Sequence, residues 1–97
     1  MEVKTKSGFK CNIDENKVKD WRFAKALAKV DSGDESAIIE GLIYAVPFVL
    51  GEKGEAELMK HVTDKAGNVP AEQMINEFRE IVTLIGNETK KSLPSQE

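Results

Sequence analysis

The sequence contains a single cysteine, Cys11, and a single histidine, His61. A thiolate beside an imidazole can act as a nucleophile, and both groups are zinc ligands. The two residues fall in different expected elements, and neither has a second cysteine or histidine at the spacing of a metal site. Catalysis by this pair would need the fold to bring them together and a third group to orient them. We therefore expect no catalytic residue, no metal site and no enzyme activity.

Two short segments have a superficial similarity to ligand-binding loops. Asp64–Asn68 clusters oxygen donors, but a calcium loop would need a closing glutamate and further donors where Val69–Ala71 stands. Gly51–Gly54 contains two glycines and a lysine, but it has neither the spacing of a phosphate-binding P-loop nor its Lys-Ser/Thr ending. The abundant glutamates fall on faces that we expect to meet solvent. The sequence therefore predicts no cofactor.

A helix–turn–helix around Gly67–Pro70 is the main alternative that the residues leave open. The second helix of such a motif would place Glu72, Glu77 and Glu80 near the phosphates. Only Arg79 would balance them, and phosphate binding requires a concentrated cationic face. We therefore expect no nucleic acid as a partner and keep a small regulatory DNA-binding protein as the second hypothesis.

The chain has 97 residues and a net charge of −3 that is unevenly distributed. Residues 1–30 hold eight Lys/Arg and four Asp/Glu, whereas residues 31–97 hold six and thirteen. A basic patch is therefore expected only near the N-terminus. No apolar run approaches the ~18–20 residues that cross a bilayer, so we expect no membrane partner. One cysteine and no apolar signal segment favour a cytoplasmic protein.

The first thirteen residues alternate between apolar and polar side chains, which is typical of strands. Val3 and Thr5 share one side, and after Gly8 every second residue from Phe9 to Ile13 is apolar. The pattern predicts a two-stranded hairpin with its reversal at Gly8. Because an isolated hairpin is only marginally stable, its apolar face must pack on the helices that follow.

Helical spacing starts after Asp14, whose carboxylate can cap a helix over residues 15–30. The apolar residues of this helix form two neighbouring stripes, Val18, Trp21, Ala24 and Ala28 in one and Phe23, Leu27 and Val30 in the other. Two stripes imply packing partners on two sides. Arg22 and Lys29 are expected to face water.

A second helix is predicted from the capping box Ser32–Glu35. Apolar side chains surround most of it from Ala37 to Leu50, so we expect it to be the central and most buried helix. Pro47 lacks an N–H group, so this helix should kink near Ile43 or restart at the proline.

Two more helices are expected, over residues 55–65 and from Pro70 to Ile85, the second cleanly amphipathic. Gly86 and Asn87 should end it. We expect an α+β fold, a hairpin packed on about four helices, with one domain over residues 1–88 and a disordered C-terminal tail over 89–97. The residues expected to be mostly buried are Trp21, Leu27, Leu42, Phe78 and Ile81.

Several phrases, taken together, resemble the small tail assembly chaperones of long-tailed, siphovirus-type phages and prophages of Gram-positive bacteria. The similarity spans most of the chain. It is carried by Ser7–Phe9, Asn12–Glu15, Asp20-Trp21, Ala26-Leu27, Leu50–Glu52, Leu58, His61, Val62, Gly67–Glu72 and Lys90–Pro94. Lys91 departs from the Lys-Asn-Ser tail of many relatives.

This resemblance implies a non-catalytic role in virion assembly. Such chaperones bind the long, apolar-rich tape measure protein, keep it soluble and help to recruit tail-tube subunits. Independently, the chain has more apolar surface than one small core needs, which suits a partner-binding protein. The candidate partner-binding residues are Phe9, Trp21, Phe23, Ile39, Ile43, Val46 and Phe48. A homo-oligomer is compatible with this surface, and a non-catalytic subunit of a larger complex is a further alternative.

Overall fold

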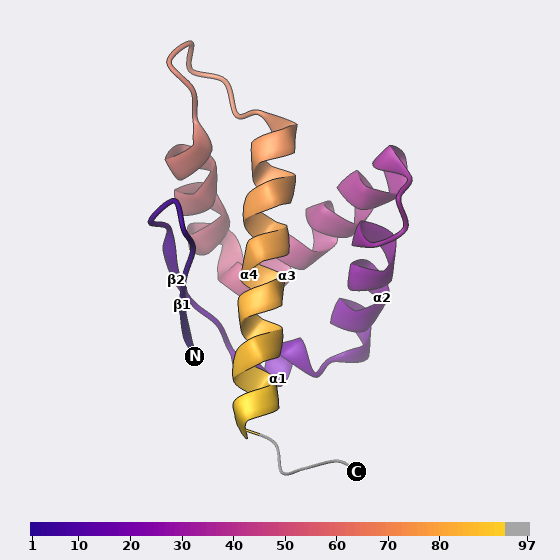
Figure 1. The fold of residues 1–97 in the computed structure, drawn as a ribbon. Helices are drawn as coiled ribbons and strands as arrows, with labels where there is room; N and C mark the ends of the chain where they lie inside the picture. The colour runs from indigo at the N-terminus through magenta and orange to yellow at the C-terminus, as the bar shows by residue number, and fades with distance from the viewer. Residues whose placement is uncertain (93–97) are drawn as a thin grey trace.

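The N-terminal hairpin predicted from the sequence is present together with four helices, and the fold is α+β (Figure 1). The two helices expected from Ser32 and over residues 55–65 are the two parts of α3. The computed structural model describes the backbone of residues 1–92 and the side chains of residues 1–87. Its elements are β1 (Glu2–Lys4), β2 (Lys10–Asn12), α1 (Glu15–Val18), α2 (Trp21–Val30), α3 (Glu35–Val62) and α4 (Ala71–Ser92).

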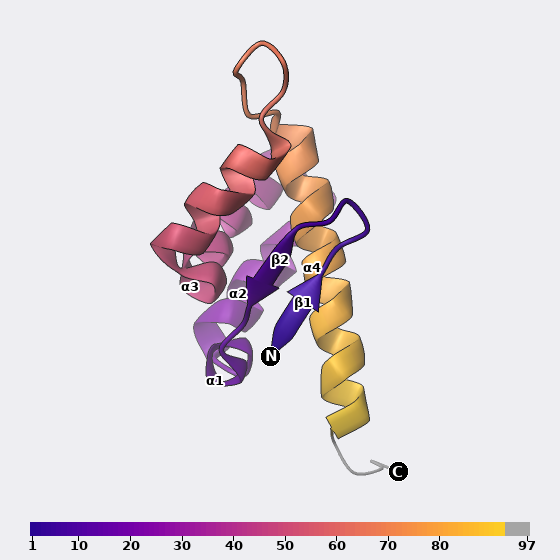
Figure 2. The same cartoon turned by 90° about the vertical axis from the view of Figure 1, so that its left-hand side faces the viewer.

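The hairpin pairs β1 with β2 in antiparallel register, Val3 opposite Cys11. Val3, Thr5, Phe9 and Ile13 are buried, as the alternation predicts. β1 packs against α4 and β2 against α3, so the hairpin lies across both helices (Figure 2). These helices supply the packing partner that a lone hairpin lacks.

The single helix expected over residues 15–30 is wrong, because the chain forms two helices with a break at Asp20. Asp14 caps α1 as predicted, with its carboxylate accepting from the N–H of Asn16 at 2.9 Å. Asp20 caps α2 in the same way, since it has extended backbone angles and its carboxylate accepts from the N–H of Arg22 at 2.7 Å. A short aspartate side chain competes with the helical hydrogen bonds of its own backbone, which ends α1 and starts α2.

Only one of the two apolar stripes of α2 is turned into the core. Phe23 and Val30 are buried, and Leu27 is half-buried beside them. Trp21 in the other stripe is 72% exposed, so its expected burial is wrong. Ala24 and Ala28 of the same stripe are also exposed, because α2 packs into the core through the side that carries Phe23, Ala26 and Val30.

Helix α3 continues through Pro47 and is broken at Gly51, where the backbone angles are φ 80° and ψ 165°. The expected restart at Pro47 is therefore wrong, and the break in helical geometry lies four residues later. Proline removes one hydrogen bond, whereas the angles at residue 51 are accessible essentially only to glycine. The bend divides α3 into a first arm, residues 35–50, and a second arm, residues 52–62, which form a V in Figure 1.

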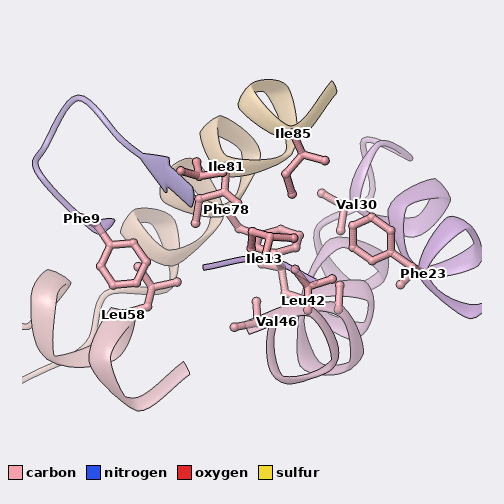
Figure 3. Packing of buried hydrophobic residues seen from close by; sticks show 14 of the residues in the cluster. Phe9, Ile13, Phe23, Val30, Leu42, Val46, Leu58, Phe78, Ile81 and Ile85 are labelled. Atoms are coloured by element: carbon pink, nitrogen blue, oxygen red, sulfur yellow. The ribbon is translucent and has the colours of Figure 1, made fainter. Parts of the chain in front are cut away.

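The core lies where the hairpin, α2, both arms of α3 and α4 converge (Figure 3). Leu58, Phe78 and Ile81 are fully buried, and Leu42 is 9% exposed, so the burial predicted for Leu42, Phe78 and Ile81 is confirmed. The guanidinium of Arg79 in α4 also donates to the carbonyl oxygen of Val30 at 3.2 Å. This bond ties α4 to the end of α2.

Helix α4 does not end at Gly86 and Asn87 but continues to Ser92. A glycine within an exposed helix costs only about 0.5–1 kcal/mol relative to alanine, which is too little to stop an otherwise stable helix. The tail expected over residues 89–97 therefore begins in helical structure, and its last part, 93–97, lies outside the described residues.

Candidate binding surface on helices α2 and α3

Large apolar side chains are exposed on α2 and on the first arm of α3. Trp21 is 72% exposed and Ile43 67%, while Ile39 and Tyr44 are each about two-fifths exposed, at 38% and 40%. Three of these residues, Trp21, Ile39 and Ile43, are among the partner-binding candidates predicted from the sequence. Large exposed apolar side chains are candidates for contact with a protein partner.

Phe9, Phe23 and Val46, by contrast, lie in the core and are not available to a partner in this structure. Phe9 packs under the hairpin, and the other two line the interface of α2 with α3. Each lies on the side of its strand or helix that another element covers. The sequence alone does not show which side that is. The prediction that these three residues bind a partner is therefore wrong, because all three are buried in the core.

Phe48 is half-buried and anchors a small group of aromatic and cationic side chains. Its ring stacks on Tyr44 with the centroids 5.3 Å apart. The guanidinium of Arg22 lies 5.3 Å and the ammonium of Lys17 5.4 Å from the centroid of the same ring. Cations at this distance are attracted by the ring face, so α1, α2 and α3 are joined at this corner.

A groove of about 320 Å³ runs between α2 and the first arm of α3. It is lined by Arg22, Lys25, Ala26, Lys29, Glu40, Gly41 and Tyr44. The two helices approach closely here, because a Cβ at position 41 would lie only 2.6 Å from the carbonyl oxygen of Ala26. Small residues therefore form the floor, and long cationic side chains and a tyrosine form the rim. Trp21, Ile39 and Ile43 do not line this groove, and Ile39 and Ile43 instead border a second hollow beside Met74 and Ile75 of α4. We call the exposed residues Trp21, Ile39 and Ile43 the α2–α3 surface.

Two of the three cations in the groove already have carboxylate partners. Arg22 donates from Nε and Nη2 to the two oxygens of Asp20 at 3.0 and 2.8 Å. This side-chain pairing lowers the pKa of Asp20 to about 2 and raises the pKa of Arg22. Lys29 Nζ lies 3.3 Å from a carboxylate oxygen of Glu40. Within the part of the chain whose side chains are described, Lys25 makes no ion pair.

The groove was not predicted from the sequence, because Arg22 and Lys29 were each expected to face water and their common position on α2 was not considered. Arg22, Lys25 and Lys29 are spaced by three and four residues, which places them on one side of a helix. That spacing is a readable signal for a cationic stripe. Tyr44 carried no comparable signal, because its exposure depends on how α3 packs.

A second cluster, not predicted from the sequence, joins the hairpin turn to the C-terminal end of α3 and to the first half of α4. Ser7 Oγ lies 2.8 Å from Nε2 of His61 and donates to Oε2 of Glu77 at 2.8 Å. Since the one hydroxyl hydrogen of Ser7 points to Glu77, the serine oxygen accepts from His61. A serine nucleophile needs the reverse, with histidine accepting from the hydroxyl and oriented by the acid. The geometry therefore describes a polar clamp.

The alternative pairing of Cys11 with His61 gains no support from the structure. Burial raises the pKa of the Cys11 thiol, which reduces the thiolate fraction that would attack a substrate. His61 instead packs against Phe9, with ring centroids 5.5 Å apart. No three His, Cys, Asp or Glu side chains converge as metal ligands anywhere in the described range.

No protein-family model, curated protein or solved structure matches this chain. Among the helices of residues 1–92, none combines the length and the apolar character needed to cross a membrane.

Proposed function

We propose that this chain is a non-enzymatic, cytoplasmic tail assembly chaperone that binds a tape measure protein and helps to recruit tail-tube subunits. The proposal combines the sequence resemblance with the α2–α3 surface. It assigns partner binding to Trp21, Ile39 and Ile43. It requires no cofactor.

The observation that carries the proposal is the exposure of Trp21 and Ile43 beside a core that is already complete without them. Leu58, Phe78 and Ile81 fill the interior with almost no exposed area, so these two side chains are not spare core residues. Leaving a tryptophan in water forgoes the stabilisation that its burial would provide. A partner with an apolar surface would recover that stabilisation, as the tape measure protein of the resembling family would.

Co-expression with a tape measure protein tests this function directly. The wild-type chain should raise the soluble fraction of the tape measure protein, and Trp21→Ala combined with Ile43→Ser should remove most of that increase. Met59→Ala is the matched control, since Met59 is 39% exposed on the second arm of α3, outside the proposed surface. Equal precipitation of the tape measure protein with and without this chain would refute the chaperone function.

The cationic stripe of α2 favours DNA binding as a second candidate function. Arg22, Lys25 and Lys29 line one groove, and α2 contains no acidic residue. Two of these cations are neutralised by Asp20 and Glu40, however, which weakens the attraction to phosphates. A mobility shift of duplex DNA that persists at about 200 mM salt and is lost in Lys25→Glu would favour this candidate over the chaperone.

A further inference from the structure

An apolar hollow lies between the first arm of α3 and the beginning of α4. It has a volume of about 160 Å³, and among the described residues that line it only Glu55 is charged. Its apolar walls include Ile39 and Ile43 of α3 and Met74 and Ile75 of α4. Because Ile39 and Ile43 are 38% and 67% exposed, another protein can reach this hollow from solvent.

The helices that form the hollow carry negative charge. Residues 35–50 and 71–78 together contain four glutamates and no lysine or arginine. Glu35 lies one helical turn before Ile39 on the same side of α3, and Glu72 lies in the first turn of α4. A protein surface that fits the hollow must therefore combine apolar side chains with positive charge.

The exposed side of α2 has this chemistry. Trp21 is 72% exposed, and Ala24 and Ala28 in its stripe are exposed as well. Helix α2 contains one arginine, two lysines and no carboxylate. Lys25 follows Trp21 by one helical turn and therefore lies beside the stripe. This side of α2 is complementary to the hollow in both polarity and charge.

The two complementary surfaces cannot meet within one chain. Helix α2 lies at one side of the fold, where it packs on α1 and α3 (Figure 1). It turns Phe23 and Val30 toward the core and Trp21 away from it. The hollow opens on a different side of α3, against α4. A second copy of the chain can bring the two surfaces together.

We propose that copies of this chain associate head to tail, with the exposed side of α2 of one copy, centred on Trp21, seated in the hollow between α3 and α4 of the next. The inference goes beyond the proposed function, because it concerns what covers the α2–α3 surface when no other protein is bound. Association removes apolar area of both surfaces from water and brings the cations of α2 to the glutamates of the hollow. Since the two surfaces differ, every added copy offers a new one, and the assembly grows beyond a dimer into a ring or a filament.

Two variants that each lose one surface test the inference. Trp21→Ala removes the aromatic ring of α2 and keeps the hollow, whereas Ile43→Ser makes the hollow polar and keeps α2. In analytical ultracentrifugation the mass of the wild type should rise with concentration beyond that of two chains, and each variant alone should remain a monomer. An equimolar mixture of the variants should form a dimer and stop there, because only one complementary pair of surfaces is left.

Tryptophan fluorescence measures the affinity within that mixture. Its only tryptophan is Trp21 of the Ile43→Ser copy, whose emission should shift to shorter wavelength as the Trp21→Ala copy is added. Adding Glu55→Lys to the Trp21→Ala copy should weaken binding about tenfold, because a cation then meets the cations of α2. Glu57→Lys is the matched control, since Glu57 is exposed and does not line the hollow, and it should leave the affinity unchanged. Circular dichroism of every variant should match the wild type.

Three outcomes would overturn the inference. A wild-type chain that stays monomeric at every concentration would show that the two surfaces do not associate. Self-association of the wild type without rescue in the mixture would place the contact elsewhere. Equal weakening by Glu55→Lys and Glu57→Lys would show that the charge of the hollow does not select its occupant. If a tape measure protein is still kept soluble in these cases, the proposed function stands. Head-to-tail association without any such increase in solubility would support the inference and refute the function.

Discussion

The hydroxyl oxygen of Ser7 lies 2.8 Å from Nε2 of His61, a contact that joins the hairpin turn to the end of α3. The same hydroxyl donates to Glu77 in α4, whose Oε2 lies 2.8 Å away. Thr5 Oγ1, 3.1 Å from Ser7 Oγ, accepts from the N–H of Phe9, which leaves its own hydrogen for Ser7. Ser7 thus connects three elements that are far apart in the sequence.

Removing the Ser7 hydroxyl should destabilise the fold. Ser7→Ala leaves Oε2 of Glu77 without its donor, and the other oxygen, Oε1, is already buried without a partner. We expect the free energy of unfolding to fall by about 1–3 kcal/mol, measured by urea denaturation. Ser36→Ala, at an exposed position in the first turn of α3, is the control and should change it by less than about 0.5 kcal/mol. Equal values for the two variants would show that the clamp does not stabilise the hairpin.

Two glycine-to-alanine substitutions within helices should act in opposite directions. At Gly41 the added methyl group would lie 2.6 Å from the carbonyl oxygen of Ala26 and 2.9 Å from Cγ2 of Val30. We expect Gly41→Ala to cost about 1–3 kcal/mol, because α2 and α3 would have to separate. At Gly86 nothing lies within 4 Å of the new methyl group. Gly86→Ala should therefore stabilise α4 by about 0.5–1 kcal/mol.

Thermal unfolding of both variants would check this pair. A loss of stability in Gly86→Ala would indicate that α4 is not continuous through residue 86. An unchanged melting temperature in Gly41→Ala would contradict the close approach of α2 and α3 that forms the floor of the groove.

Phe78 and Trp21 should differ in their contribution to stability despite their similar chemistry. Phe78 has no exposed area, so Phe78→Ala should cost about 3–5 kcal/mol through the cavity that it leaves. Trp21 is 72% exposed, so Trp21→Ala should cost less than about 0.5 kcal/mol. Chemical denaturation measures both. A large loss in Trp21→Ala would mean that this side chain belongs to the core and not to the binding surface.

The pairing of Asp20 with Arg22 predicts a specific pH dependence. The pKa of Asp20 is lowered from 3.8 to about 2, chiefly by its side-chain hydrogen bond to Arg22. A lowered pKa means that the carboxylate stabilises the fold above pH 3.8 and that this contribution is lost as the pH falls through about 2. Carboxyl NMR should give a midpoint near 2 for Asp20 and a higher midpoint, still below 3.8, in Arg22→Gln, because the N–H of residue 22 still donates to the carboxylate. A midpoint that does not move in that variant would exclude the pairing.

The local elements were largely readable from the sequence, because they depend on neighbours along the chain. Alternation of apolar residues predicted the hairpin, and the Asp14 carboxylate predicted the start of a helix. The break at Asp20 used the same capping chemistry but was obscured by a helical apolar pattern that continues across it. The bend of α3 lies at Gly51, because glycine adopts a positive φ at little energetic cost. Pro47, by contrast, is accommodated within the helix.

The candidate surface depended on information that no local pattern contains. Periodicity shows that Trp21 and Phe23 belong to two apolar stripes of one helix, but it does not show which stripe another element covers. That choice followed from the packing of α2 against α3 and left Trp21 in solvent. The Ser7, His61 and Glu77 contacts were likewise decided by the tertiary structure, since side chains separated by many residues meet only when the whole chain has folded. The sequence by itself determined the elements and their apolar faces, and the tertiary structure decided which of those faces remain free to bind.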